Sequence, residues 1–152
     1  MPSTLKIFMP ESVYLTRRAK FSAAHYFWLE DCTPDENFAR FGPSSNRNGH
    51  GHNYEVLVSI KGPCDAETGM VINLKDIKQI LDDVVVTPLN FKNLNKDIPH
   101  FKTHFPTLEN LATYLWPQLA DAITRQGCEL DSLKISEDED LYVEYFGGKL
   151  PA

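Results

Sequence analysis

Hydrophobic and polar residues alternate along two stretches in the first half of the chain. Residues 13–28 (VYLTRRAKFSAAHYFW) are rich in β-branched and aromatic side chains, which predicts one long strand with His25 near its far end. Residues 52–60 (HNYEVLVSI) alternate well enough to form a second strand. Between them, residues 29–48 supply Asp, Pro, Asn and Gly for turns. We interpret this segment as a long loop, and long loops often carry function.

Two later stretches have apolar residues at helical spacing. Asn73 can cap the first helix, whose buried face would comprise Leu74, Ile77, Leu81, Val84 and Val85. Thr107 can cap the second, with a buried face of Leu108, Leu111, Ala112, Leu115 and Leu119. Pro117 should kink this second helix or move its boundary. Residues 131–146 then predict a terminal hairpin around the acidic turn EDED.

The order of these elements, β-β-α-α-β-β, predicts an α+β fold. We expect a four-stranded antiparallel sheet with two helices on one face, forming one domain over residues 1–152. Open sheet edges in such a domain would favour assembly with other subunits.

Composition narrows the classes of protein that this chain could be. The chain is 42% apolar and 24% charged, which is typical of a soluble globular domain. Its net charge of −6 argues against nucleic acid as the main partner. Cys32, Cys64 and Cys128 are not in CxxC spacing, so we expect neither disulfides nor a thiolate zinc site. We find no signal peptide and no transmembrane run, and therefore expect a cytoplasmic protein without membrane contact.

Histidines provide the first candidate chemistry. His50 and His52 are one residue apart, so in a strand both imidazoles point to the same side. Two ligands do not make a metal site, but pairing with the first strand could bring His25 opposite them. Three neutral imidazoles with an open fourth position are the arrangement of catalytic zinc. Taken alone, Glu109 is an ordinary first-turn helix carboxylate and Glu137 part of a solvated turn.

His100 and His104 precede the second helix. Nothing near them has ligand spacing, so we interpret them as exposed loop histidines.

Several motifs in order resemble the 6-pyruvoyl-tetrahydropterin synthase family, which includes the bacterial 6-carboxytetrahydropterin synthases. They are FSAAH, FGPSSNRNGHGHNY, GMVINLKDIK, PLNFKNLN, PTLEN and the later Glu137, and in detail they look closer to the animal-type branch. The resemblance implies the T-fold, in which the sheets of three subunits form a barrel and two trimers commonly stack into a homohexamer.

The resemblance also assigns roles to matching positions. It implies that His25, His50 and His52 bind Zn²⁺, and that Glu109 and Glu137 anchor a pterin or dihydropterin through its paired N–H donors. Thr107 would line the same pocket. Family members are zinc-dependent carbon–oxygen lyases of the tetrahydrobiopterin pathway, which eliminate triphosphate from dihydroneopterin triphosphate. In them a cysteine moves the protons, activated by an Asp-His pair from a neighbouring subunit.

This sequence departs from the family at all three proton-transfer positions. Ser44 stands at the position of the cysteine, and Asn90 and Phe91 stand at those of the Asp-His pair. A serine hydroxyl is far less acidic than a thiol and needs an adjacent base. Cys32 lies outside the matching motif. His104 is a candidate substitute, because it is close in sequence to Thr107 and Glu109.

We therefore expect a zinc-containing, pterin-binding homologue that has lost the usual elimination. The alternative is a working lyase or aldolase-like enzyme in which zinc-bound hydroxide or His104 replaces the missing base. A structural oligomer with a vestigial pocket is a third hypothesis.

Overall fold

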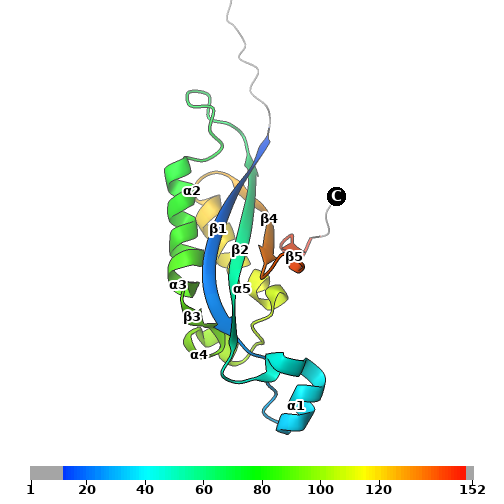
Figure 1. Cartoon of the computed structure of the whole chain (residues 1–152). Coiled ribbons are helices and arrows are strands. Elements are labelled where there is room, and N and C mark those ends of the chain that lie inside the picture. The colour runs from blue at the N-terminus through cyan, green and yellow to red at the C-terminus, as the bar shows by residue number, and fades with distance from the viewer. Residues whose placement is uncertain (1–11, 150–152) are drawn as a thin grey trace, which may run out of the picture.

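A computed structural model describes residues 12–149, which form a sheet with helices packed mainly on one face (Figure 1). The strands lie in the order β3-β1-β2-β4-β5. Their bounds are β1 Val13–His25, β2 His50–Gly62, β3 Lys92–Asn93, β4 Glu129–Ser136 and β5 Tyr142–Tyr145. The ribbon of β1 and β2 is antiparallel over thirteen residue pairs, from Val13 opposite Gly62 to His25 opposite His50.

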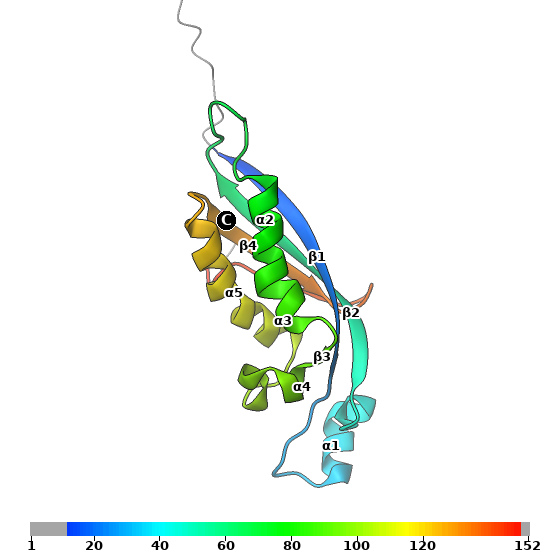
Figure 2. The same cartoon turned by 90° about the vertical axis from the view of Figure 1, so that its left-hand side faces the viewer.

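The helices cover the face of the sheet that carries the alternating apolar residues. Figure 2 shows α2 (Leu74–Leu81), α3 (Thr87–Leu89) and α5 (Leu108–Thr124) on the same side of the strands. A π-helical turn over Asp82–Val86 joins α2 to α3, so the helix capped by Asn73 runs on to Leu89. Side chains from every second position of β1 and β2 pack beneath these helices, including Phe21, Val56, Val58 and Ile60. The α+β prediction is therefore confirmed.

The sheet has one strand more than the four that we expected. The short β3 pairs parallel with Ala23 and Ala24 of β1. It is followed by α4 (Leu94–Asp97) and a 3₁₀ helix over Pro99–Lys102. Two residues carry too little alternation to show as a strand, which is why the pattern did not predict it.

The segment between β1 and β2 is not the loop that we expected. It contains α1 (Pro34–Phe41) and a 3₁₀ helix over Gly42–Ser45. Thr33 and Glu36 form a capping box at the start of α1, with Pro34 in its first turn. This spacing is a known sequence signal for a helix start, and the interpretation of residues 29–48 as a loop overlooked it.

Element ends also shift from the predicted ones. The strand β1 ends at His25 rather than Trp28, because beyond it the backbone of Tyr26 bonds to a side chain and that of Phe27 to Ser44. The strand β2 begins at His50, two residues before the predicted start. Pro117 lies inside α5 and does not end it. The proline is exposed, so solvent can reach the carbonyl group whose intrahelical bond it removes.

The terminal hairpin of β4 and β5 confirms the prediction for the end of the chain. After β5 the chain turns back over α5, where Gly147 lies against the Trp116 indole. A Cβ at position 147 would be 2.4 Å from a ring carbon of Trp116, and the φ of Gly147 is +70°. Only glycine fits there without strain.

None of the described helices is both long and apolar enough to span a bilayer. The N-terminal segment for which we predict no signal peptide lies outside the described residues.

Candidate metal centre and adjoining pocket

Strand pairing brings the three predicted histidines together. His25 is the last residue of β1 and lies directly opposite His50, the first residue of β2, so both point to the same face of the sheet. His52 is two residues further along β2 and shares that face. One potential ligand atom from each ring lies within 4.8 Å of the others. Long-range register thus creates a cluster from residues that are 25 positions apart in the chain.

The ring nitrogens have an orientation that suits a metal ion. Nδ1 of His25 is 2.8 Å from the carbonyl oxygen of Pro106 and donates its hydrogen to it, which leaves Nε2 with a free lone pair. Among the described residues, Nε2 of His25 and Nε2 of His52 are buried without a hydrogen-bond partner. Buried polar atoms without partners are rare in native proteins because they lose solvation. A divalent cation would satisfy both atoms, so the residues fit such a group.

Burial favours the neutral form of His25 and of His50. His25 is only 1% exposed, and burial lowers its pKa to about 4 despite the opposing hydrogen bond to Pro106. Burial also lowers the pKa of His50, and the neighbouring His52 adds to the effect. The neutral form is the one that can ligate a metal.

One of the two predicted carboxylates lies beside the cluster. Oε2 of Glu137, just after β4, is 3.8 Å from Nε2 of His52. Burial raises the pKa of Glu137; His52 opposes the shift, whereas Asp138 and Glu109 add to it. Glu109 is exposed in the first turn of α5, after the N-cap Thr107. Glu137 therefore lies against the histidine cluster, and Glu109 begins the helix that follows Pro106, the hydrogen-bond partner of His25.

The chain is similar to proteins of one family along nearly its whole length. The family model for 6-pyruvoyl tetrahydropterin synthase matches residues 14–148. The chain belongs to this family. It is 38% identical over 133 residues to human 6-pyruvoyl tetrahydrobiopterin synthase, covering 88% of this chain and 90% of that one. The solved structure of the Caenorhabditis elegans synthase has a TM-score of 0.83 and 34% identity, covering 93% and 100% of the two chains. The predicted resemblance is confirmed.

Ser44, Asn90 and Phe91, which we interpret as departures from the family motifs, are tied to the backbone or turned outward. The carbonyl of Ser44 accepts a 2.8 Å hydrogen bond from the Phe27 N–H. The side-chain oxygen of Asn90 accepts one of 2.9 Å from the Ser22 N–H. Phe91 has a φ of +60° and is 86% exposed in the isolated chain.

The candidate substitutes for the missing base lie outside the histidine cluster. His104 is exposed, and its ring stacks on that of His100 with centroids 4.3 Å apart. Its Nδ1 lies 3.2 Å from the His100 carbonyl oxygen. His100 is half-buried against Tyr114, so only His104 matches the prediction of exposed loop histidines. Cys32 lies near Arg40, with Sγ 4.0 Å from its guanidinium.

Tyr54 is a member of the site that sequence reasoning missed. It is buried, and its hydroxyl is 3.4 Å from Nδ1 of His25. Burial raises the pKa of this hydroxyl, and Glu137 adds to the effect. Tyr54 shares a strand face with His50 and His52, and that period-two spacing could have identified it.

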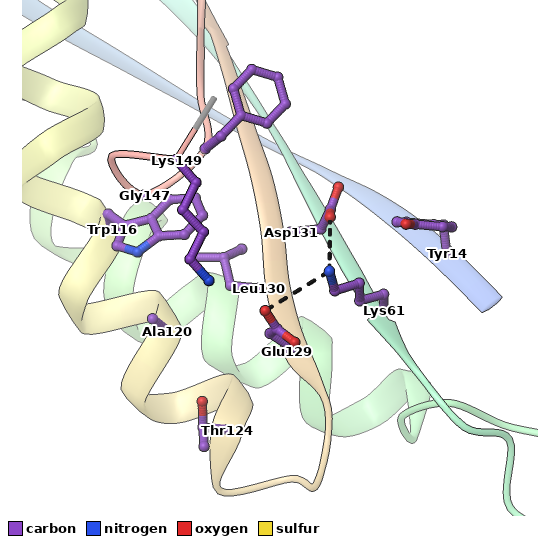
Figure 3. Close-up of a pocket in the computed structure, with 11 residues that line it drawn as sticks. Tyr14, Lys61, Trp116, Ala120, Thr124, Glu129, Leu130, Asp131, Gly147 and Lys149 are labelled. Atoms are coloured by element: carbon purple, nitrogen blue, oxygen red, sulfur yellow. Dashed lines mark ion pairs between the residues drawn. The ribbon is translucent and has the colours of Figure 1, made fainter. Parts of the chain in front are cut away.

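A separate cavity of about 590 Å³ lies away from the histidines (Figure 3). It is lined by Trp116 and Lys149 and by residues at the opposite ends of β1 and β2, including Tyr14 and Lys61. The Lys61 ammonium is 3.9 Å from Glu129 and 3.6 Å from Asp131. This cavity shares no lining residue with the candidate metal centre.

Proposed function

We propose that this chain is a zinc-holding, pterin-binding homologue of the synthase that does not carry out the usual triphosphate elimination. One observation carries the proposal. The three histidines are clustered with Glu137 beside them and Glu109 is present, whereas the three matched proton-transfer positions hold Ser44, Asn90 and Phe91. The homo-oligomeric assembly and the cytoplasmic location that we expect belong to the same proposal.

The retained residues are suited to holding a ligand. His25, His50 and His52 would hold Zn²⁺, which when bound supplies a Lewis acid for oxygen atoms of the ligand. Glu109 and Glu137 would accept hydrogen bonds from the ring N–H and exocyclic amino group of a pterin or dihydropterin. The raised pKa of Glu137 indicates a partly desolvated carboxyl group, in which such hydrogen bonds are stronger than in water.

The substituted residues are poorly suited to moving protons. The Ser44 hydroxyl would need an adjacent base, and the matched positions that supply one in the family hold Asn90 and Phe91 here. Asn90 has no carboxylate to orient a base, and its side-chain oxygen is already bonded to Ser22. Phe91 has a hydrocarbon ring in place of an imidazole.

The test combines turnover with ligand identification. Purified protein is incubated with dihydroneopterin triphosphate and a reductase that traps the product, and separately denatured to release any bound molecule for absorbance and mass measurement. We expect no turnover and a released pterin. A variant carrying Ser44→Cys, Asn90→Asp and Phe91→His serves as the matched comparison. Turnover by the unmodified protein at a rate typical of enzymes refutes the proposal, and the absence of any pterin supports a vestigial pocket.

The alternative, an active lyase or aldolase-like enzyme with His104 as base, has its own test. Here His104→Ala should abolish turnover of any pterin substrate. The stacking of His104 on His100, with Nδ1 close to a main-chain carbonyl, favours the binding function instead.

A further inference from the structure

One hydrogen bond determines which nitrogen of His25 is available to a metal. The ring donates Nδ1–H to the Pro106 carbonyl oxygen, so Nε2 keeps its lone pair for the cluster. Because the acceptor is a main-chain oxygen, no side-chain substitution removes it. Its position depends on whatever holds the chain on either side of the bond.

On the strand side, the chain is held by Asn95 of α4. Tyr26 directly follows His25, and its N–H donates to the Asn95 side-chain oxygen at 2.9 Å. The Tyr26 carbonyl oxygen accepts from the Asn95 amide nitrogen, also at 2.9 Å. One side chain thus pairs with both backbone groups, as a neighbouring strand would, beyond the point where β1 ends.

On the loop side, the chain is held by Asn110 of α5. Its amide nitrogen donates to the Phe105 carbonyl oxygen at 2.8 Å, and the Thr107 N–H donates to the same oxygen at 2.8 Å. The Phe105 ring stacks on Phe27, with centroids 5.8 Å apart and planes nearly parallel. The peptide that precedes Pro106 is therefore fixed through its oxygen and through the adjacent side chain.

We propose that Asn95 and Asn110 are positioning residues for the metal ligand His25. They act through the Pro106 hydrogen bond, which fixes the ring and keeps its hydrogen on Nδ1. This inference rests on the metal centre of the proposed function. Outer partners of metal-ligating histidines fix tautomer and orientation in general, and their loss typically lowers metal affinity by about 10- to 100-fold.

A substitution at Asn110 can test its effect on the His25 ring separately from its effect on the stability of α5. Asn110 is the third residue after the N-cap Thr107, where a carboxylate is favoured by the helix dipole. Asn110→Asp should therefore leave α5 stable while it removes the N–H donor and sets a charged oxygen against the Phe105 carbonyl. Asn95→Asp likewise keeps the acceptor for Tyr26, loses the donor and sets a charged oxygen against the Tyr26 carbonyl.

The matched control is Asn73→Ala. Asn73 caps α2 and accepts a 2.9 Å hydrogen bond from the Lys75 N–H, far along the chain from the strand ends that carry the histidines. Loss of this cap should lower stability without disturbing His25.

The experiment measures zinc affinity by chelator competition, the urea midpoint of metal-free protein, and the His25 tautomer from imidazole nitrogen NMR shifts. We expect Asn110→Asp and Asn95→Asp to bind zinc about 10- to 100-fold more weakly, with mixed tautomers, and we expect Asn110→Asp to keep a midpoint near that of the unmodified protein. Asn73→Ala should lower the urea midpoint and leave the zinc affinity and the His25 tautomer unchanged.

Unchanged zinc affinity and a single tautomer in Asn110→Asp would overturn the inference. An equal loss of zinc affinity in Asn73→Ala would overturn it as well.

The tautomer measurement uses metal-free protein. If the unmodified protein bound no zinc, the proposed function would fail, while the NMR shifts would still show whether the two asparagines control the His25 ring.

Discussion

His25 combines three constraints that rarely coincide at one side chain. It ends a strand, it is almost fully buried, and it has one nitrogen bonded to Pro106 and the other without a partner among the described residues. Each constraint alone has a structural explanation. Together they describe a neutral imidazole whose free lone pair is available to a metal ion shared with His50 and His52.

The lowered pKa of His25 predicts how the stability of metal-free protein depends on pH. The unfolded chain takes up a proton near pH 6.5, whereas the folded protein does so only near pH 4. As the pH falls between these values, the unfolded state binds more protons, so the free energy of unfolding decreases. The slope is about 1.4 kcal/mol per pH unit for one such group, and His50 adds to it.

Urea denaturation in the presence of a chelator, from about pH 7.5 down to about pH 5, measures this slope. The His25→Gln variant is the control and should show a shallower dependence. Equal slopes in the two proteins would contradict the assignment of the effect to His25.

For single residues, the sequence predicts which histidines are candidate ligands better than it predicts what surrounds them. The spacing of His50 and His52, and the place of His25 in a strand, indicate a cluster before any coordinates are known. The carbonyl of Pro106 carries no such signal, because a main-chain oxygen is the same in every residue and its partner lies 81 positions away.

At the level of elements, one buried side chain fixes the start of the segment between β1 and β2, which we call the insertion. Asn37 of α1 is fully buried and makes four hydrogen bonds, one from the Leu29 N–H and three to the carbonyl oxygens of Leu29, Cys32 and Thr33. It therefore fixes the chain that leads from the metal-bearing strand into the segment carrying Ser44.

Asn37→Leu should loosen this insertion without unfolding the sheet. The substitution removes all four bonds and leaves partly buried backbone groups of Leu29 and Cys32 without these partners, which costs about 2 kcal/mol. Hydrogen exchange should accelerate in residues 29–45 and stay slow in β2 and β4. The exposed Asn48, changed to leucine, is the matched control. Uniform acceleration across the whole molecule would show that the insertion does not open independently.

The long helices confirm the predictions made from the apolar pattern, whereas the short elements could not be predicted from it. The apolar stripe predicts α5, and six residues of that helix are buried at regular spacing. The two-residue β3 and the π-helical turn after α2 are set by tertiary contacts that local pattern does not contain. The parallel pairing of β3 with β1 is likewise a long-range choice.

Across the whole molecule, the described sheet has two open edges. The outer side of β1 pairs with β3 only at Ala23 and Ala24, and β5 ends the sheet on the other side. Open edges with unpaired backbone groups favour pairing with further copies, in line with the trimer or hexamer that we expect for this family member. The exposed Phe91 lies beside the β1 edge, with its N–H bonded to the Ser22 carbonyl.

Phe91→Asp should therefore weaken assembly. Aspartate tolerates the positive φ at this position better than phenylalanine, so the isolated chain should fold as before. Analytical ultracentrifugation is expected to show a trimer or hexamer for the unmodified protein and smaller species for the variant. The prediction that Leu74 lies on the buried face of its helix is wrong, because this first residue of α2 is 51% exposed. Leu74→Asp is therefore a similar change at an exposed position and should keep the assembly. A monomeric unmodified protein, or an unchanged variant, would contradict this expectation.

The thirteen-pair register of β1 and β2 has a consequence for which length changes the chain can tolerate. Deleting one residue between the buried part of β1 and His25, such as Ala24, puts His25 at a position that faces the other side of the sheet when the rest of the register is kept. His25 would then lie on the opposite face from His50 and His52, although the deletion removes none of the three. Insertions between the two strands leave the register intact. The spacing between the buried positions of each strand and its histidines must therefore be kept for the cluster to form.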